Sequence, residues 1–348
     1  MHNAARVELA PGYSICRIIN GCWQLTPDHG GGPATHRQAL ERFAQLYDHG
    51  LTTFDCADIY RGTEALLGRF RRSLPDPDAI QVHTKLVPDK DTLDQLTDAS
   101  IDAIIDRSRR RLAVERLDLV QFHWWDYAVA GLDRLVERLL NAQHHGKIRL
   151  LGVTNFDSKH VHKLLLGGAN IVSVQAQYSL LDRRPQRHMR TLCEEHPVRI
   201  LPYGVLAGGF LSRRYLGAPP PSTMNRSLQK YRLIIDEIGG WDVFQRLLEV
   251  LARIAARHQT TIGAVAARWV LDQDGVAGII LGIGTTPRAQ QNAALLDLVL
   301  SDEDHGELDA HLANQAIPPG DMYDLERDAD GPHTRIIKTN LQGAGTAS

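Results

Sequence analysis

Four polar residues with complementary chemistry follow consecutive apolar runs in the first 123 residues of the chain. Asp55 and Tyr60 lie in FDCADIY, Lys85 ends the run AIQVHTK, and His123 follows LDLVQF. An ammonium group beside a phenol lowers the phenol's pKa from its ordinary value of about 10, and a carboxylate keeps that ammonium charged. An imidazole donates a hydrogen bond that orients a carbonyl oxygen. Together the four groups would polarise a C=O bond and protonate its oxygen.

This set of residues contains no redox centre, so carbonyl reduction would require a nicotinamide or flavin cofactor as hydride donor. Lys85 is the one evident nucleophile, which leaves a Schiff-base aldolase as an alternative. A metal-dependent hydrolase is disfavoured, because the pair His160 and His162 falls in a helical pattern and not at the end of a strand.

The elements that would position these residues form a repeating pattern of short apolar runs and longer amphipathic segments. Runs without strict alternation are typical of parallel strands that are buried on both faces. Eight such units predict a (β/α)8 TIM barrel, in which the carboxyl ends of the strands meet at one mouth. A doubly wound sheet is the alternative. The predicted strands are residues 17–23, 51–55, 79–85, 117–124, 149–155, 171–177, 199–204 and 278–284.

Helical patterns separate the predicted strands. We expect helices over residues 35–50, with Thr35 as the N-cap, 63–73, 91–112, 131–146, 157–168 and 184–196. Two segments depart from this pattern. A long loop over 207–240 follows the seventh strand, and loops of this length often cover functional sites. We predict a single barrel domain over 1–348, with a core at about 13–315 and a polar tail at 316–348 that is partly disordered at its very end.

The composition predicts a cytoplasmic, water-soluble protein. Apolar residues make up 43% and charged residues 23% of the chain, and the formal net charge is −2. A charge this small gives no attraction to nucleic acid or to an anionic membrane. Cys16, Cys22, Cys56 and Cys193 show no paired spacing, which indicates reduced thiols. We therefore expect a small-molecule partner, while monomer and homo-oligomer both remain open.

Two segments indicate where a dinucleotide would bind. GIGTTP at 282–287 follows the last strand and opens a helix, where free amides, Thr285 and Arg288 would attract phosphate. Tyr203 ends the seventh strand, where its ring would stack on a nicotinamide. Asn155 and Gln175 would hold the carboxamide of that ring.

The combination of these motifs resembles the aldo-keto reductase family. FDCADIYRGTE, with Asp55, Tyr60 and Glu64, is similar to the family's signature, and Lys85 and His123 occupy the places of its remaining catalytic pair. LGVTNF, LPYGVLAGGFLS and GIGTTPRAQQNAALLD also match, so the resemblance covers about residues 13–315. It implies NAD(P)H-dependent reduction of an aldehyde or ketone, with Asp55, Tyr60, Lys85 and His123 as catalytic residues and Tyr60 as proton donor.

The resemblance also implies a set of cofactor contacts. These are Gly21, Cys22, Trp23, Asp55, Thr154, Asn155, Gln175, Tyr203, Gly204, Leu206, Gly208, Gly284, Thr285, Arg288, Gln291 and Asn292. Family members often place a basic residue near position 282 or 284, where this chain has glycine. Arg288 is therefore the sole clear basic group for a 2′-phosphate, so we expect NADPH with NADH also possible, and no metal.

Aromatic residues near the predicted mouth favour flat or apolar carbonyl compounds. We expect Trp23, Tyr60, His123 and Trp124 to contact the substrate. A second functional alternative also remains, because some relatives are cofactor-binding, redox-sensing regulatory subunits with little turnover.

Overall fold

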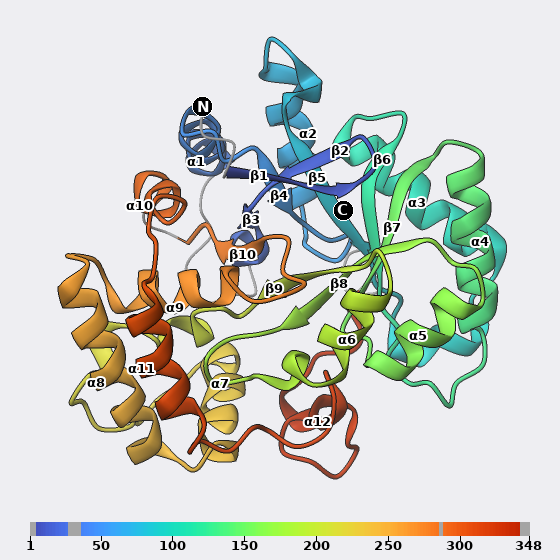
Figure 1. Cartoon of the computed structure of the whole chain (residues 1–348). Coiled ribbons are helices and arrows are strands. Elements are labelled where there is room, and N and C mark those ends of the chain that lie inside the picture. The colour runs from blue at the N-terminus through green and yellow to red at the C-terminus, as the bar shows by residue number, and fades with distance from the viewer. Residues whose placement is uncertain (1–4, 27–35, 285–287, 342–348) are drawn as a thin grey trace.

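The computed structural model describes residues 5–26, 36–284 and 288–341 of the 348-residue chain, and its centre is a sheet of eight parallel strands (Figure 1). The order in the sheet is β10-β3-β4-β5-β6-β7-β8-β9, so the strands follow chain order from β3 to β9 and the last strand, β10, pairs with the first, β3. The strands are β3 (Ile18–Gly21), β4 (Thr53–Asp55), β5 (Gln81–Leu86), β6 (Leu117–Phe122), β7 (Ile148–Thr154), β8 (Ile171–Gln177), β9 (Arg199–Tyr203) and β10 (Ile279–Gly282).

The sheet curves into a nearly closed barrel. Ile200 in β9 pairs with Val276, just before β10, through hydrogen bonds from Ile200 N to Gly275 O and from Ala277 N to Ile200 O. Every residue of β8 is buried, because helices cover the outside while side chains fill the inside. The predicted TIM barrel and its eight strand positions are confirmed.

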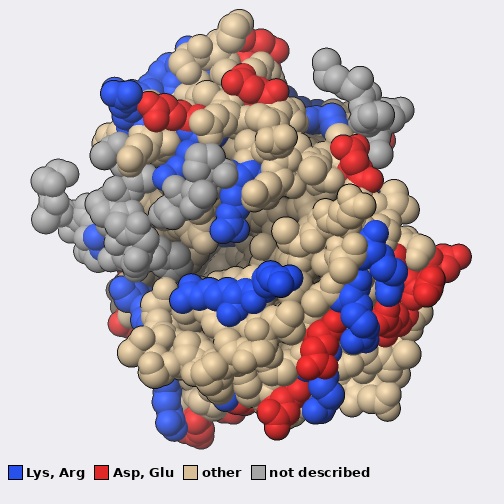
Figure 2. Space-filling model, turned by 90° about the vertical axis from the view of Figure 1, so that its left-hand side faces the viewer, with Lys and Arg blue, Asp and Glu red and all other residues tan. Residues whose placement is uncertain are grey.

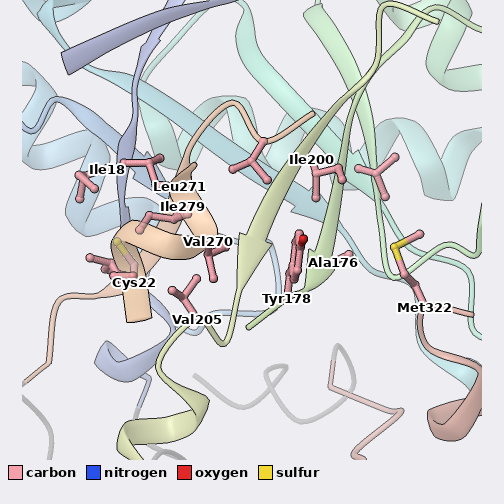
Figure 3. Close-up of a cluster of buried hydrophobic side chains, with 14 of the residues drawn as sticks. Ile18, Cys22, Ala176, Tyr178, Ile200, Val205, Val270, Leu271, Ile279 and Met322 are labelled. Carbon is pink, nitrogen blue, oxygen red and sulfur yellow. The ribbon is translucent and has the colours of Figure 1, made fainter. Parts of the chain in front are cut away.

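Helices cover the outside of the barrel. They are α1 (His36–Asp48), α2 (Thr63–Ser73), α3 (Asp98–Leu112), α4 (Leu132–His144), α5 (Ser158–Leu166), α6 (His188–Glu195), α8 (Trp241–Arg257), α9 (Ile262–Leu271), α10 (Ala289–Ala294) and α11 (Asp302–Leu312). Figure 3 shows how strands and helices share one core, with Ile18, Ile200, Val270 and Ile279 from β3, β9, α9 and β10 gathered in a single cluster.

The predicted helix over residues 91–112 is two helices. A 3-10 helix spans Lys90–Gln95, and α3 begins after Thr97, whose side chain accepts from Ser100 N while the Ser100 side chain accepts from Thr97 N. This capping box ends the first segment because the N-cap residue takes an extended backbone conformation. The N-cap predicted at Thr35 lies outside the described residues.

An antiparallel hairpin that the sequence pattern did not predict precedes the barrel. Its strands are β1 (Arg6–Ala10) and β2 (Tyr13–Cys16). Tyr13 and Ile15 join a hydrophobic cluster with barrel residues such as Leu119, Leu150 and Leu201. The hairpin therefore packs against barrel side chains.

The long segment after β9 and the chain's last described segment are both folded, and they lie side by side (Figure 1). The 207–240 segment contains α7 (Arg226–Glu237), and the last segment contains α12 (Asp324–Arg327). Arg226 Nε donates to Ile336 O at 3.0 Å, which ties one to the other. Further 3-10 helices are Trp23–Leu25, Pro77–Ala79, Arg184–Gln186, Ala207–Gly209, Arg213–Tyr215 and Thr334–Ile336.

Within the described residues, no helix combines the length and the apolar character that crossing a bilayer requires.

Candidate active site

The carboxyl ends of β4 and β5 bring an acid and a lysine into direct contact. Asp55 is the last residue of β4, and Lys85 Nζ lies 2.8 Å from both of its carboxylate oxygens. A third bond of 2.8 Å joins Lys85 Nζ to the Cys56 carbonyl oxygen. These three contacts use all three N–H groups of the ammonium. Lys85 is thus held as a charged group, an arrangement that does not favour a Schiff-base nucleophile.

Tyr60 lies in the turn after β4, and Lys85 Nζ lies 5.2 Å from the centroid of its ring. The sequence predicted that Lys85 would lower the pKa of Tyr60, and the structure corrects that direction. Burial, followed by the charge of Asp55, raises the pKa of Tyr60 well above its ordinary value. The ammonium charge is largely compensated by the carboxylate in contact with it, so the phenol keeps its proton at neutral pH.

His123 follows β6 and is fixed by its backbone neighbour. Its Nδ1 lies 2.9 Å from the Thr154 carbonyl oxygen, and burial together with the charge of Arg327 lowers its pKa to about 3. The ring is therefore neutral at pH 7. Because a carbonyl oxygen only accepts, Nδ1 carries the proton and Nε2 presents a lone pair. This changes the predicted role of His123, which in this tautomer accepts through Nε2 and does not donate.

Aromatic side chains pack beside the two central rings. The centroid of Trp23 lies 4.8 Å from that of Tyr60, and the centroid of Trp125 lies 4.3 Å from that of His123. The predicted substrate contact Trp124 is incorrect, because its side chain is fully buried in the main core. Consecutive residues point in different directions, and Trp125, not Trp124, packs its ring against His123.

The C-terminal segment contributes to the site, which the sequence did not indicate. Tyr323 lies with its ring centroid 5.5 Å from that of His123, in an edge-on arrangement. Arg327 donates to the carbonyl oxygens of Trp124, Trp125 and Asn155 at 2.9, 3.2 and 2.8 Å. These three carbonyls follow β6 and β7, so Arg327 fastens the segment to the barrel mouth.

A buried ion network behind this segment also escaped prediction. Glu326 contacts Arg184 at 3.2 Å and Lys230 at 3.5 Å, and Arg184 contacts Asp182 at 2.7 Å. Burial of Glu326 favours its neutral form, but the charges of Arg184 and Lys230 prevail and lower its pKa to about 2. The network joins the loop after β8, helix α7 and the C-terminal segment.

The residues predicted for the nicotinamide end lie together at the carboxyl ends of β7, β8 and β9. Tyr203 donates its hydroxyl to Asn155 Oδ1 at 2.8 Å, and Lys230 Nζ lies 5.1 Å from the Tyr203 ring centroid. Gln175 Nε2 donates to Asp55 Oδ1 at 2.7 Å. The amide of Gln175 therefore links the predicted cofactor residues to the Asp55–Lys85 pair.

Two predicted cofactor glycines, Gly204 and Gly208, lie against Tyr231 of α7. A Cβ atom at these positions would lie 2.5 Å from Tyr231 Oη and 2.8 Å from Tyr231 Cδ2. Both have positive φ, at 68° and 65°. Glycine is thus required there by the approach of α7, and Leu206 between them is half-buried.

The residues near β3 that were predicted to contact the cofactor differ in their exposure to solvent. Trp23 is 37% exposed, whereas Cys22 is fully buried in the main core, where burial strongly raises the pKa of its thiol. The Cys22 side chain is therefore unavailable to a ligand. A Cβ atom at Gly21 would lie 2.9 Å from Ile280 Cγ2, so the close packing of β3 against β10 requires this glycine.

The residues predicted for the adenosine phosphate follow β10. Arg288 and Asn292 line a small cleft between α10 and α1, Gln291 is exposed on α10, and Gly284 has a positive φ of 60°. Thr285 lies outside the described residues. Figure 1 places α1 and α10 on the side that Figure 2 turns toward the viewer, where a hollow has Lys and Arg side chains above and below it.

No group of three or more His, Cys, Asp or Glu side chains in the described part of the chain is arranged to hold a metal ion. His160 instead stacks on Tyr127 and contacts Asp157, the N-cap of α5.

Comparison with known proteins identifies the family that this chain matches. The model of the Aldo/keto reductase family matches residues 17–313. The chain is 26% identical over 318 residues to the NADH-specific methylglyoxal reductase of Escherichia coli (strain K12), covering 84% of this chain and 93% of that protein. It is 28% identical over 297 residues to flagellar radial spoke protein 5 of Chlamydomonas reinhardtii, covering 67% of this chain but 56% of that longer protein.

Solved structures share the fold. The glycerol dehydrogenase from Gluconobacter oxydans has a TM-score of 0.74 at 23% identity, over 92% of this chain and 98% of that one. An aldo/keto reductase from Klebsiella pneumoniae in complex with NADP and acetate has a TM-score of 0.67 at 25% identity, over 91% and 96%. The resemblance that the sequence motifs indicated is confirmed.

Proposed function

Because the chain belongs to the aldo/keto reductase family of NAD(P)H-dependent oxidoreductases, we propose that it reduces an aldehyde or ketone with NADPH, using Tyr60 as proton donor. The observation that carries this proposal is the contact of Lys85 with Asp55 beneath the Tyr60 ring, at the mouth that His123 also borders. NADH remains an alternative donor, and a cytoplasmic location remains a prediction from the sequence.

The raised pKa of Tyr60 suits a general acid for a developing alkoxide. The phenol keeps its proton until the substrate oxygen becomes more basic than the phenolate, and then donates it. Lys85 stays charged beside the ring and stabilises the phenolate that remains. Asp55 orients Lys85, and Gln175 holds Asp55 through a bond of 2.7 Å.

His123 orients the substrate as a neutral group. Its Nε2 has no partner among the described residues, so this lone pair is available to a donor such as a hydroxyl group on the substrate or the phenol of Tyr60. Trp23, Trp125 and Tyr323 provide flat apolar surfaces around the two rings. These surfaces favour flat or apolar carbonyl compounds.

The residues present fit a nicotinamide cofactor. Tyr203 provides an aromatic face, Asn155 and Gln175 provide amides, and Arg288 with Asn292 provides polar groups for the adenosine phosphate. When bound, the reduced nicotinamide supplies the hydride that the protein's own side chains lack.

The proposal is tested by following NADPH absorbance with 4-nitrobenzaldehyde in the natural protein and in Tyr60→Phe. Loss of the phenol removes the proton donor and keeps the ring, so kcat should fall by about 10²- to 10⁴-fold. Tyr47→Phe is the matched control, because Tyr47 packs against Phe70 on the outer helices and should leave kcat unchanged.

Undiminished turnover by Tyr60→Phe would show that another group delivers the proton. Binding of NADPH without turnover of any of a panel of aldehydes and ketones would instead favour a cofactor-sensing subunit.

A further inference from the structure

Arg327, the last residue of α12, bridges the carboxyl ends of two barrel strands. Its Nη2 donates to the Trp124 carbonyl oxygen at 2.9 Å and to the Asn155 carbonyl oxygen at 2.8 Å. Trp124 lies just after β6 and Asn155 directly after β7, and these two strands pair with each other. One guanidinium group therefore holds the backbone at both strand ends.

Further contacts fix the position of this guanidinium group. Arg327 Nε donates to the Trp125 carbonyl oxygen at 3.2 Å. Its Cζ lies 4.3 Å from the ring centroid of Tyr127 and 5.1 Å from that of Tyr323, and cations are attracted to aromatic rings at such distances. Because the donors of a guanidinium group lie in one plane, these contacts together determine its orientation.

Asn155 has a backbone conformation that needs support. Its φ is 61°, in the left-handed region that residues other than glycine adopt infrequently. Its N–H donates to the Gln175 carbonyl oxygen at 2.9 Å, and its own carbonyl oxygen accepts from Arg327. Such a conformation persists where surrounding contacts hold it. Arg327 therefore helps to keep Asn155 left-handed.

The backbone of Asn155 in turn determines where its side-chain amide lies. Asn155 Oδ1 accepts from the Tyr203 hydroxyl at 2.8 Å, which places the amide among the residues proposed to hold the nicotinamide. A change in the φ of Asn155 would turn this amide away from Tyr203. The C-terminal segment is thus connected to the nicotinamide end through one backbone carbonyl.

We propose that Arg327 is a positioning residue for the nicotinamide, because it holds Asn155 in the conformation that directs the side-chain amide toward the carboxamide of that ring. This inference rests on the proposed function and goes beyond it, since it gives the C-terminal segment a role in cofactor binding. Arg327 bonds to backbone carbonyls and acts through Asn155.

Dissociation constants of NADPH and of 2′,5′-ADP, which lacks the nicotinamide, test the proposal by fluorescence titration or calorimetry. Arg327→Met removes the donors, so NADPH should bind about 10-fold more weakly or worse, while binding of 2′,5′-ADP should change less than about twofold. Arg327→Lys keeps the charge but lacks the planar set of donors, and its NADPH constant should lie between the two.

Asn155→Gly tests whether Arg327 acts through Asn155. Glycine adopts a φ of 61° without strain, so the backbone keeps its conformation while the amide is lost. Adding Arg327→Met to Asn155→Gly should therefore weaken NADPH binding by less than about a further twofold. If the two effects multiply instead, Arg327 does not act through Asn155 and the proposal is wrong.

Arg335→Met is the matched control, because it removes an exposed arginine of the same segment whose Nη2 donates to the Asp330 carbonyl oxygen. Its NADPH constant should match that of the natural protein. Equal weakening of NADPH and 2′,5′-ADP by Arg327→Met would overturn the proposal, since Arg327 would then support the whole domain. Unchanged NADPH binding would also overturn it. Selective weakening without any carbonyl turnover would support the positioning role while refuting the reductase function.

Discussion

The Nδ1 atom of His123 lies 2.9 Å from the carbonyl oxygen of Thr154, and this contact determines which ring nitrogen carries the proton. The pKa of His123 is lowered to about 3, so the ring is neutral throughout the range in which most enzymes work. His123 is therefore a neutral group with a fixed orientation, and it does not gain or lose a proton near neutral pH.

We predict that kcat/KM shows no titration of His123 between about pH 5 and pH 8. The folded protein binds this proton only as the pH falls toward 3, below the whole of that range. The measurement is the pH profile in the natural protein and in His123→Asn. An inflection near pH 6.5 that is present in the first and absent in the second would contradict the neutral assignment.

The Asp55–Lys85 pair should be required for folding stability as well as for activity. Asp55 is 3% exposed, so Lys85→Met leaves a buried carboxylate with the Gln175 amide and without its cation. Breaking a buried pair in this way costs about 3–5 kcal/mol in the free energy of unfolding. Urea unfolding should show this loss, and Lys85→Met with Asp55→Asn should recover most of it. A double variant as unstable as the single one would refute the pairing argument.

Glu326→Gln should loosen the C-terminal segment. The change removes the charge that pairs with Lys230 and Arg184, so the free energy of unfolding should fall and the segment should become more sensitive to protease. Glu307→Gln is the control, because Glu307 pairs with Arg253 and Arg257 near the surface, where each ion pair contributes about 1 kcal/mol or less.

The loss of stability caused by Glu326→Gln should become smaller as the pH falls. The pKa of Glu326 is about 2 in the folded protein and 4.5 ordinarily, so its stabilising contribution is fully present above pH 4.5 and is lost as the pH falls toward 2. The difference in stability between the two proteins should therefore narrow over that interval. A difference that stays constant would mean that the charge of Glu326 is not what stabilises the segment.

His83, inside the barrel, should make the protein less stable in acid. Neither of its ring nitrogens has a partner among the described residues, and burial lowers its pKa from 6.5 to about 3. Between these values the unfolded chain binds a proton that the folded one does not, so stability falls by about 1.4 kcal/mol per pH unit. His83→Leu should reduce this slope, measured by unfolding at pH 4 to 8, whereas the exposed His162→Gln should not. If the stability of His83→Leu and of the natural protein depended on pH with the same slope, His83 would not be the cause of the loss of stability in acid.

The sequence by itself determined the barrel and four of the residues at its mouth. Apolar runs separated by helical patterns define parallel strands, and parallel strands in chain order have their carboxyl ends on one side. Asp55, Lys85 and His123 each follow or end such a run, and Tyr60 lies in the turn just after Asp55. The convergence of all four therefore follows from the fold alone. The capping box that divides residues 91–112 was also present in the sequence, as Thr97 and Ser100, but the helical periodicity on both sides concealed it.

Only the tertiary structure decided which side chains lie at the site and which are buried in the core. Trp124 and Trp125 are the same residue type in adjacent positions, and the direction of each side chain depends on the packing of the turn after β6. The lowering of the Tyr60 pKa predicted from Lys85 was reversed, because burial and the charge of Asp55 outweigh the charge of Lys85.

The remaining parts of the site depend on contacts between distant segments. Asp55 lies 120 positions before Gln175, and Lys230 lies 96 positions before Glu326, yet the side chains of each pair are in contact. A local pattern of residue types specifies strands and helices because their repeats span a few residues. Such a local pattern does not indicate which charged side chains the closed barrel will bring together, or which of them it will bury. The distances between these charges and the burial of each charge determine the pKa values in the site.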